Sequence, residues 1–395
     1  MNSIKLKRGK EKAIFQKHPW IFSGAIEKIQ GNPKNGEVVS VVSLTGEFLA
    51  FGYFNAQSRV AIRIIEWDNT LSIDEQWYYQ KIKTAIEARQ QLINGQDTNT
   101  YRLIFSEADY LPGLIVDQYD QYLSVQILSS GILNAKDMII NALRDLLQPK
   151  GIFDRSDATA LTHEGLANNN GLLWGENPPE FLEVKENGLK YLVNISSGQK
   201  SGFYCDQREN RKILSQFVKG KSVLDCFSYS GGFSLNALKN GASSVVSVDS
   251  SALAIETLEK NIQLNGFENI NHESIQSDVN KQLRAFKDAG KKFDVIILDP
   301  PKYAPSKSAL DRAARAYKDL NRLGMQLLNP GGLLATFSCS GAVDIETFKQ
   351  ILAWAALDAD KEVQVIYQFC QPLDHPVRLS FPEGEYLKGL LIKVN

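Results

Sequence analysis

From about residue 205 to the C-terminus, short apolar runs alternate with segments whose apolar residues recur at helical spacing, as in residues 251–264. This alternation predicts a parallel sheet with helices on both faces, because each crossover must return the chain to the same end of the sheet. The last two runs have no helical segment between them, so we expect them to form an antiparallel pair. The predicted strands are 222–227, 244–249, 270–277, 294–299, 333–338, 363–369 and 386–394.

Five strand–helix units followed by a hairpin are typical of class I (Rossmann-like) methyltransferase domains, whereas a dehydrogenase more often continues to alternate. We therefore predict an α/β fold with a seven-stranded sheet for residues 185–395. Residues 1–72 contain alternating apolar runs separated by Gly-centred turns, which predict a small β-barrel. Residues 73–184 combine two helical patterns with short strands and are predicted to form a small α+β middle domain. A hairpin turn is expected at Asn187-Gly188.

The composition of the 395 residues is globular, with 43% hydrophobic residues and no apolar run long enough to predict a membrane-spanning helix. Four cysteines without CxxC spacing favour a reducing cytoplasm. Residues 1–34 carry eight Lys and Arg against two Glu, and Phe15, Trp20 and Phe22 lie among them. Basic and aromatic side chains together can bind a phosphate backbone and stack on bases. An ordinary solvated surface is the alternative.

The loop after the first strand of the C-terminal sheet is a candidate cofactor site. Ligands of such sheets bind beyond the carboxyl ends of the strands. Glycines there allow close approach of the backbone, although a double glycine alone also fits a tight turn. The candidate contacts in this loop are Asp225, Phe227, Ser228, Tyr229, Gly231 and Gly232.

Acidic residues also end the next three predicted strands. Asp249 lies 24 residues after Asp225 in the sequence (249 − 225), about the separation expected of a carboxylate that binds ribose hydroxyls. Asp278 is expected to bind the adenine amine. A single Asp after a strand is more often a helix cap, but four at one sheet edge are hard to explain as caps. The loop lacks G-x-G-x-x-G, so we expect S-adenosylmethionine, a cation without phosphates, as the cofactor. Further candidate contacts are Ser250, Val279, Asp299 and Pro300.

Three segments together resemble one known family, the bacterial large-subunit ribosomal RNA cytosine-C5 methyltransferases of the RlmI type. They are Gly198-Gln199-Lys200-Ser201-Gly202-Phe203-Tyr204-Cys205-Asp206-Gln207-Arg208-Glu209-Asn210, Asp299-Pro300-Pro301-Lys302 and Phe337-Ser338-Cys339-Ser340-Gly341. The resemblance covers nearly the whole chain. It also includes His18-Pro19-Trp20-Ile21-Phe22, which is similar to the start of that family's PUA RNA-binding domain. It implies large-subunit ribosomal RNA as partner and Phe203, Asp206 and Arg208 as cofactor contacts.

The chemistry of this family assigns a role to Cys339. Carbon 5 of cytosine is a poor nucleophile, and a thiolate that adds to carbon 6 turns the ring into an enamine that can attack a sulfonium methyl group. Cys339 follows the fifth predicted strand, at the cofactor edge, and is the expected nucleophile; a buried structural thiol is the alternative. Asp299 is expected to hydrogen-bond the base at N3, or else to cap the following turn. Lys302 is a candidate substrate contact, or else a solvated side chain.

Other assignments stay open in the sequence. Many cytosine-C5 RNA methyltransferases carry a second cysteine where this chain has Lys302, so the group that removes the C5 proton is unassigned. Asp-Pro-Pro also occurs in enzymes that methylate base nitrogens, and a noncatalytic RNA-binding assembly factor is a third reading. The four histidines are scattered and predict no metal site. A homodimer is compatible with the sequence. Basic residues that are expected to follow RNA, or to form an exposed helix face, are Lys307, Arg312, Arg315, Lys318 and Arg322.

Overall fold

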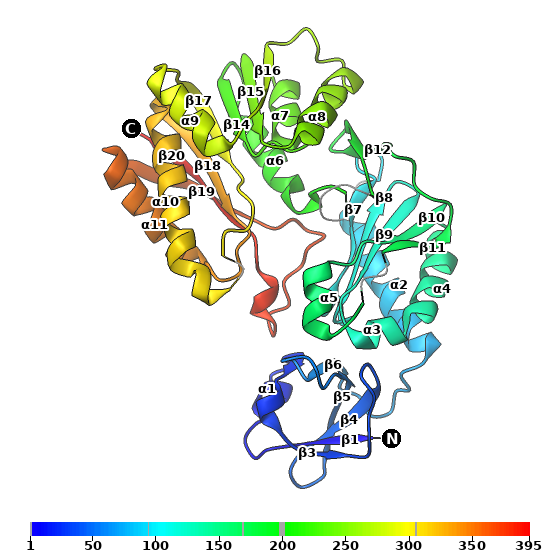
Figure 1. Cartoon of the computed structure of the whole chain (residues 1–395). Helices are drawn as coiled ribbons and strands as arrows, with labels where there is room; N and C mark the ends of the chain where they lie inside the picture. Colours follow the sequence, from blue (N-terminus) through cyan, green and yellow to red (C-terminus); the bar gives the residue numbers. More distant parts are fainter. Residues whose placement is uncertain (1, 94, 168–169, 197–201, 305) are drawn as a thin grey trace. The chain divides into compact units, whose positions relative to one another are not determined.

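The structure, a computed structural model, describes residues 2–93, 95–167, 170–196, 202–304 and 306–395 (Figure 1). Its contacts divide the chain into two compact units. Unit 1 comprises Met1–Lys185, Val193–Cys205 and Leu373–Gly384, and unit 2 comprises Glu186–Leu192, Asp206–Pro372 and Glu385–Asn395. The boundary expected near residue 72 lies inside unit 1, so the three-domain division stays a prediction.

Unit 1 begins with a six-stranded sheet in the order β2-β6-β5-β4-β1-β3. Its strands are β1 (Ser3–Leu6), β2 (Trp20–Ile21), β3 (Ile26–Gln30), β4 (Val38–Val42), β5 (Phe48–Phe54) and β6 (Ile62–Glu66), with α1 (Lys12–Phe15) and the 3₁₀ turn η1 (Ser23–Ala25) between them. Alternate side chains such as Val39, Val41, Ile62 and Ile64 point to one face and are buried, as the period of two in the sequence requires.

A five-stranded sheet in the order β11-β10-β9-β8-β7 follows. Its strands are β7 (Thr100–Phe105), β8 (Leu114–Tyr119), β9 (Tyr122–Ile127), β10 (Gly151–Asp154) and β11 (Gly171–Gly175). The helices of this segment are α2 (Glu75–Leu92), α3 (Ser130–Asn134), α4 (Lys136–Leu147) and α5 (Ala158–Glu164), with the 3₁₀ turn η2 (Ser106–Asp109). The predicted helix 134–147 is confirmed as α4, and the unpredicted short helix α3 precedes it and meets it at Ala135.

Part of the first sheet of unit 1 packs into the hydrophobic core of the middle segment. Phe51, Tyr53 and Ile65 of the first sheet belong to the same buried cluster as Trp77 and Tyr78 of α2. The hydroxyl groups of Tyr53 and Tyr78 are hydrogen-bonded at 2.7 Å inside this cluster. The N-terminal sheet therefore has a buried cluster of its own, which includes Val41 and Ile62, and a second apolar contact with the middle segment.

Charged side chains also tie the two parts of unit 1 together. Arg63 of β6 donates to Glu107 at 3.0 Å and to Glu164 at 2.8 Å, and all three side chains are largely buried. Trp20 donates its indole N–H to Glu107 at 2.7 Å. Removing the barrel would leave two buried carboxylates without these partners, which is strongly destabilising.

Unit 2 contains a seven-stranded sheet in the order β16-β15-β14-β17-β18-β20-β19 (Figure 1). Its strands are β14 (Ser222–Cys226), β15 (Ser244–Asp249), β16 (His272–Gln276), β17 (Phe293–Leu298), β18 (Leu328–Ser338), β19 (Val363–Cys370) and β20 (Lys388–Val394). The first five are parallel, and β20 is antiparallel to both β18 and β19. The predicted antiparallel ending is confirmed, and β20 lies between β18 and β19.

The faces of this sheet follow the alternation of its strands. Leu224, Val246, Ile296 and Leu334 point to the face covered by α9, α10 and α11, whose apolar residues belong to the same buried cluster. The helices of unit 2 are α6 (Arg208–Leu214), α7 (Gly232–Lys239), α8 (Ala252–Leu264), α9 (Val279–Asp288), α10 (Leu310–Gln326) and α11 (Ile345–Ala359). Its 3₁₀ turns are η4 (Ser215–Phe217) and η5 (Lys307–Ala309), while η3 (Cys205–Gln207) crosses the unit boundary and η6 (Pro382–Gly384) belongs to unit 1.

A short hairpin formed by β12 (Leu182–Glu186) and β13 (Leu189–Val193) precedes this sheet. Its two turn residues, Asn187 and Gly188, have φ angles of 50° and 71°. Positive φ at both central positions defines the type I′ turn that Asn-Gly favours. The predicted hairpin is confirmed.

Candidate active site

The loop between β14 and α7 takes a tightly curled path. Phe227, Tyr229 and Gly231 have φ angles of 62°, 47° and 86°, and the amide of Gly231 donates to the carbonyl of Ser228 at 2.8 Å. A Cβ atom on Gly231 would lie 2.7 Å from Leu235 and 2.9 Å from Leu258. The glycine is therefore required by the packing of α7 and α8 as well as by its backbone conformation.

Asp225 is fully buried at the end of β14. One carboxylate oxygen accepts hydrogen bonds from the amide and the hydroxyl of Ser234, at 3.0 and 2.6 Å. The other, Oδ1, is buried without a hydrogen-bond partner among the described residues. Burial raises the pKa of Asp225 to about 7, the Ser234 hydroxyl opposes this, and the carboxylates of Asp299 and Asp249 add to it. Asp249 and Asp299 are thus close enough to Asp225 to disfavour its negative charge.

Asp249 connects the ends of β14 and β15. Its Oδ2 accepts the amide of Tyr229 at 2.9 Å, and its Oδ1 accepts the amide of Ser251 at 2.9 Å. Asp249 is not the cap of α8, since the Ser251 hydroxyl accepts the amide of Ala254 and fills that role. Ser250 lies exposed beside it. The carboxylate therefore shapes the glycine loop.

Asp278 does act as a helix cap. It is the N-cap of α9, and its side chain accepts the amide of Lys281 at 2.9 Å. The Asp278 side chain is exposed, whereas Val279 beside it is buried. The capping alternative thus describes Asp278 in this structure, and its contact with a cofactor stays a prediction.

The motif around residues 198–210 is only partly described, because residues 197–201 lie outside the described ranges. Phe203, Asp206 and Arg208 are all buried. Asp206 accepts the hydroxyl of Tyr386 at 2.8 Å, and Arg208 donates to Glu209 at 3.0 Å. Phe203 belongs to unit 1, whereas Asp206 and Arg208 belong to unit 2.

Asp299 and Cys339 follow adjacent parallel strands. Leu298, the last residue of β17, pairs with Thr336 of β18, so both side chains come after the carboxyl ends of neighbouring strands. Each is partly exposed, while Pro300 is buried. Burial raises the pKa of Tyr317 in α10, and the negative charges of Cys339 and Asp299 add to this. Tyr317 thus lies near both groups.

A buried hydroxyl network holds the loops that carry these two residues. Ser338 donates to the hydroxyl of Tyr317 at 2.9 Å, and that hydroxyl is 3.1 Å from the hydroxyl of Ser340. Ser340 in turn accepts the amide of Ala304 from the loop after Asp299, at 3.0 Å. Both neighbours of Cys339 are therefore fixed. The serines were visible in the sequence, but nothing there pointed to Tyr317.

The other cysteines are poorly placed for nucleophilic chemistry. Cys205 and Cys226 are buried, and burial raises the pKa of Cys226 well above its usual value, with a further contribution from Asp225. Cys370, the last residue of β19, is exposed overall. Partial burial of its thiol raises its pKa, and the negative charge of Glu385 adds a smaller increase. A raised pKa keeps a thiol protonated and less reactive.

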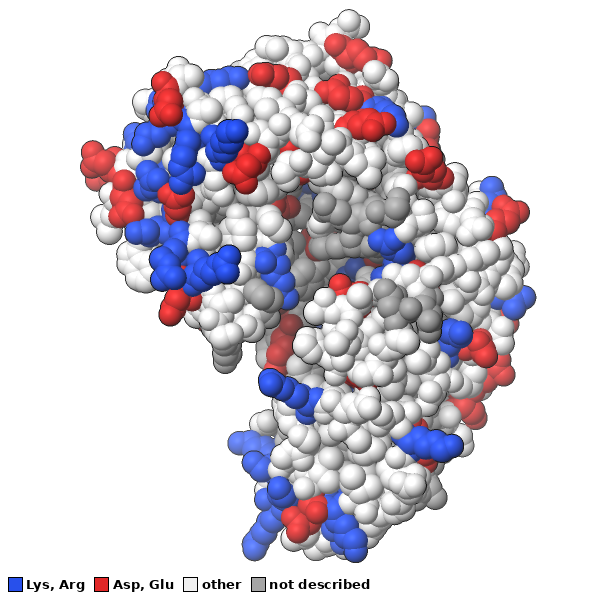
Figure 2. Space-filling model, viewed as in Figure 1, with Lys and Arg blue, Asp and Glu red and all other residues white. Residues whose placement is uncertain are grey.

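The basic side chains on α10 are divided between ion pairs and solvent. Lys318 pairs with Asp358 at 2.7 Å, and Arg322 pairs with Asp319 at 2.6 Å. Arg312 and Arg315 are exposed, as is Lys302 in the loop after Asp299. The side chain of Lys307 lies outside the part that the structure describes. Figure 2 shows Lys and Arg interspersed with acidic side chains over the α9 and α10 region, so only part of the series presents a positive surface.

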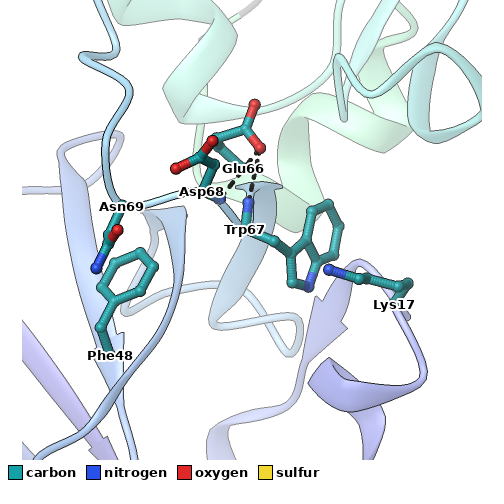
Figure 3. Close-up of a pocket in the computed structure, with 6 residues that line it drawn as sticks. All are labelled: Lys17, Phe48, Glu66, Trp67, Asp68 and Asn69. Atoms are coloured by element: carbon teal, nitrogen blue, oxygen red, sulfur yellow. Dashed lines mark hydrogen bonds between the residues drawn. The ribbon is translucent and has the colours of Figure 1, made fainter.

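A separate pocket lies in unit 1, lined by Lys17, Phe48, Glu66, Trp67, Asp68 and Asn69 (Figure 3). Both of its acidic groups are already engaged. Glu66 accepts the Trp77 indole at 3.1 Å and pairs with Lys81 at 3.1 Å, while Asp68 accepts the amide and the hydroxyl of Thr70 at 2.8 and 2.7 Å. None of the residues expected to bind a cofactor lies in this pocket. Among the described residues, no group of three or more His, Cys, Asp or Glu could hold a metal ion, and no helix could span a membrane.

Comparison with known proteins identifies the family. Residues 4–67 match the family model of a PUA-like domain, and residues 158–363 match that of an S-adenosylmethionine-dependent methyltransferase. "Ribosomal RNA large subunit methyltransferase I" of Aliivibrio fischeri is 45% identical over 99% of both chains, and that of Photobacterium profundum is 46% identical over 98% of both. The chain belongs to the ribosomal RNA large subunit methyltransferase I family. The resemblance stated from the sequence motifs is confirmed.

The fold of this methyltransferase also matches a solved structure. SMU.776, solved in complex with SAH, has a TM-score of 0.87 at 22% sequence identity and full coverage of both chains. The predicted class I sheet preceded by a PUA-like domain is confirmed. S-adenosylmethionine is the cofactor, as the acidic strand ends predicted.

The described residues fit this cofactor. Its sulfonium carries a positive charge, and the Asp225 carboxylate is repelled by those of Asp249 and Asp299 at the edge where the strands end. A cation bound there would relieve this repulsion. The partnerless oxygen of Asp225 is a further acceptor.

We therefore expect the affinity for S-adenosylmethionine to rise by roughly tenfold between pH 6 and pH 8. A bound cation favours the Asp225 carboxylate, whose pKa near 7 means that the carboxyl is mostly protonated below that pH. Binding must then displace a proton at pH 6 but not at pH 8. Calorimetric titration at both pH values measures the change. Asp225→Asn, which keeps the acceptor for Ser234, should bind more weakly and lose this pH dependence; an unchanged slope would contradict the assignment.

Proposed function

We propose that this methyltransferase forms 5-methylcytosine in large-subunit ribosomal RNA. The choice of large-subunit ribosomal RNA as substrate rests on the names of the relatives reported above. The observation that carries the choice of atom is the place of Cys339, a partly exposed thiol beside Asp299 on the edge where the strands end. A base-nitrogen methyltransferase needs no nucleophile there.

The proposed reaction uses Cys339 as a covalent catalyst. Its thiolate adds to carbon 6 of the cytosine, which makes carbon 5 electron-rich. S-adenosylmethionine supplies an electrophilic methyl group for carbon 5. Loss of the proton from carbon 5 and cleavage of the carbon–sulfur bond then restore the aromatic ring and the thiolate. We propose that Asp299 hydrogen-bonds the base at N3 and that Lys302 contacts the RNA.

The proposed cofactor contacts fall into two groups, one supported by the structure and one by the sequence alone. Asp225, Asp249 and the loop Phe227, Ser228, Tyr229, Gly231 and Gly232 surround the carboxyl end of β14. Phe203, Asp206, Arg208, Ser250, Asp278, Val279 and Pro300 rest on the sequence. The cytoplasmic location and a homodimer likewise stay predictions, and we propose residues 1–72, 73–184 and 185–395 as functional domains.

The test is nucleoside mass spectrometry of large-subunit ribosomal RNA taken from cells that lack this gene. Incubation with the purified full-length protein and S-adenosylmethionine should add one 5-methylcytosine per RNA molecule. A methyl group on a base nitrogen would contradict the cytosine-C5 proposal and support methylation of a base nitrogen. The absence of any added methyl group would contradict both.

We further propose that the PUA-like domain binds RNA through its basic and aromatic surface. Phe15 is 71% exposed and Phe22 is 53% exposed, while Trp20 packs against Phe381 with ring centroids 4.7 Å apart. Figure 2 shows Lys and Arg side chains along this part of the molecule. The two exposed aromatics are therefore available for stacking, whereas Trp20 is partly structural.

Replacing Arg8, Lys10 and Lys12 with alanine should weaken RNA binding and reduce its salt dependence. Each basic side chain that binds a phosphate releases counterions from the RNA, so fewer counterions are released when these contacts are lost. All three side chains are exposed, so the core should be unaffected. The slope of log affinity against log salt should fall by about 0.7 for each lost contact with single-stranded RNA. Filter binding at several salt concentrations measures both effects. The matched control replaces three exposed lysines of unit 2, Lys219, Lys281 and Lys287; equal losses in the two variants would contradict the assignment.

A further inference from the structure

Lys388 occupies an unusual place in the fold. It is the first residue of β20 and pairs with Ser338 of β18, the residue immediately before Cys339. Its side chain is only 7% exposed, and the residues that follow it in β20, Gly389, Leu390, Leu391 and Ile392, are buried and apolar or lack a side chain. Lysine is rarely buried unless it is paired, because taking an ammonium group out of water is costly.

The ammonium group of Lys388 is held by two backbone carbonyls. Nζ donates to the carbonyl of Ser340 at 2.9 Å and to the carbonyl of Tyr386 at 2.8 Å. Among the described residues no carboxylate forms an ion pair with it. The hydrogen bonds satisfy two of its three donors but leave its positive charge unneutralised. Since Ser340 directly follows Cys339, this charge lies against the backbone of the loop that carries the thiol.

The charged groups around Lys388 include Cys339. Burial lowers the pKa of Lys388, and the negative charge of Cys339 is the strongest opposing influence, ahead of the carboxylates of Glu385 and Asp344. The positive charge of Lys302 acts in the same direction as burial. Tyr317 also lies near Cys339, because the negative charges of Cys339 and Asp299 both help to raise the pKa of Tyr317. Lys388 is thus a buried cation near the thiol. The acidic groups in the same surroundings are Asp299, Glu385 and Asp344.

We infer that Lys388 stabilises the thiolate of Cys339 and so keeps the nucleophile ready at neutral pH. A nearby ammonium group favours the charged form of a thiol, and the effect is larger where water is excluded. Lys388 acts through Cys339 and is a positioning residue. The inference rests on the proposed role of Cys339 as nucleophile. If Lys388 only joined β18 to β20, its charge would have no effect on the thiol.

The experiment measures the alkylation of Cys339 by iodoacetamide against pH, in the full-length protein without RNA. Peptide mass spectrometry follows the Cys339 peptide, and a Cys370→Ser background removes the exposed cysteine. Lys388→Gln keeps a donor for the carbonyls but removes the charge, and Lys388→Met is a second neutral variant. Both should raise the midpoint of the alkylation profile by about one pH unit, which is a tenfold slower reaction at pH 7.

Two further variants complete the design. Lys388→Arg keeps the charge and should restore the midpoint, whereas Lys393→Gln, an exposed lysine of the same strand, should leave it unchanged. Cofactor affinity and thermal unfolding identify any variant that fails to fold. A midpoint that stays in place in a folded neutral variant would overturn the inference. Because no RNA is present, this outcome is independent of whether 5-methylcytosine is formed.

Discussion

Cys339→Ala is expected to abolish methyl transfer, with a loss of about 10⁴- to 10⁶-fold, while the fold and the cofactor affinity remain close to those of the parent protein. Without the thiolate, carbon 5 of the cytosine is not activated. The substitution removes one partly exposed sulfur atom. Ser338, Ser340 and Tyr317 keep the hydrogen bonds that hold the loop, since these bonds do not use the Cys339 side chain.

A trapped intermediate distinguishes this chemistry from methylation of a base nitrogen. RNA that contains 5-fluorocytosine should form an adduct with the parent protein that survives denaturing electrophoresis, because fluorine cannot leave carbon 5 as the proton does. The adduct should be absent from Cys339→Ala and present in Cys370→Ala, the matched control at an exposed cysteine. Substantial activity in Cys339→Ala would contradict the cytosine-C5 proposal. An adduct mapped to Cys205 or Cys226 would support the cytosine-C5 reaction but show that the nucleophile is not Cys339.

Asp249→Ala should weaken S-adenosylmethionine binding by roughly 10- to 100-fold, which corresponds to about 1.5–3 kcal/mol for a charge-assisted hydrogen bond. The carboxylate is expected to bind the ribose. It also accepts the amides of Tyr229 and Ser251, so its loss should loosen the glycine loop that we propose as part of the cofactor site. Both effects act in the same direction.

Calorimetry measures the affinity of Asp249→Ala against the parent protein. Asp288→Ala is the matched control, because it removes an exposed carboxylate of unit 2 at the end of α9. Asp249→Asn separates the two effects, since an amide oxygen can still accept one of the loop amides but carries no charge. Unchanged affinity in Asp249→Ala would remove this residue from the cofactor site.

The strands and their parallel or antiparallel directions could be predicted because both depend on local patterns, whereas the order of the strands across the sheet came from the structure. Strand–helix alternation with a final uninterrupted pair of strands is sufficient to indicate five parallel strands and an antiparallel ending. The Asn187-Gly188 turn was equally predictable, since few residues adopt positive φ at two successive positions. The acidic strand ends followed from the same pattern, because the carboxyl ends of parallel strands meet at one edge.

The capping roles of acidic residues at the strand ends could not be predicted, because neighbouring side chains compete for the same backbone amides. Asp278 occupies a strand end in the sequence, yet it caps α9, while Ser251 rather than Asp249 caps α8. A sequence shows that an Asp or Ser follows a strand, but which one accepts the first amides depends on the geometry of the turn.

The sequence by itself determined the class of fold and the cofactor, and it predicted Cys339 as the nucleophile. Only the tertiary structure showed that the first sheet and the middle segment meet at Tyr53 and Tyr78, and only it placed Tyr317 and Lys388 near Cys339. Tyr317 is 22 residues from Cys339, and Lys388 is 49 residues from it. Periodicity shows which residues share a face of one element. It carries no information on which elements will meet, because that depends on strand pairing and helix packing between segments distant in the sequence.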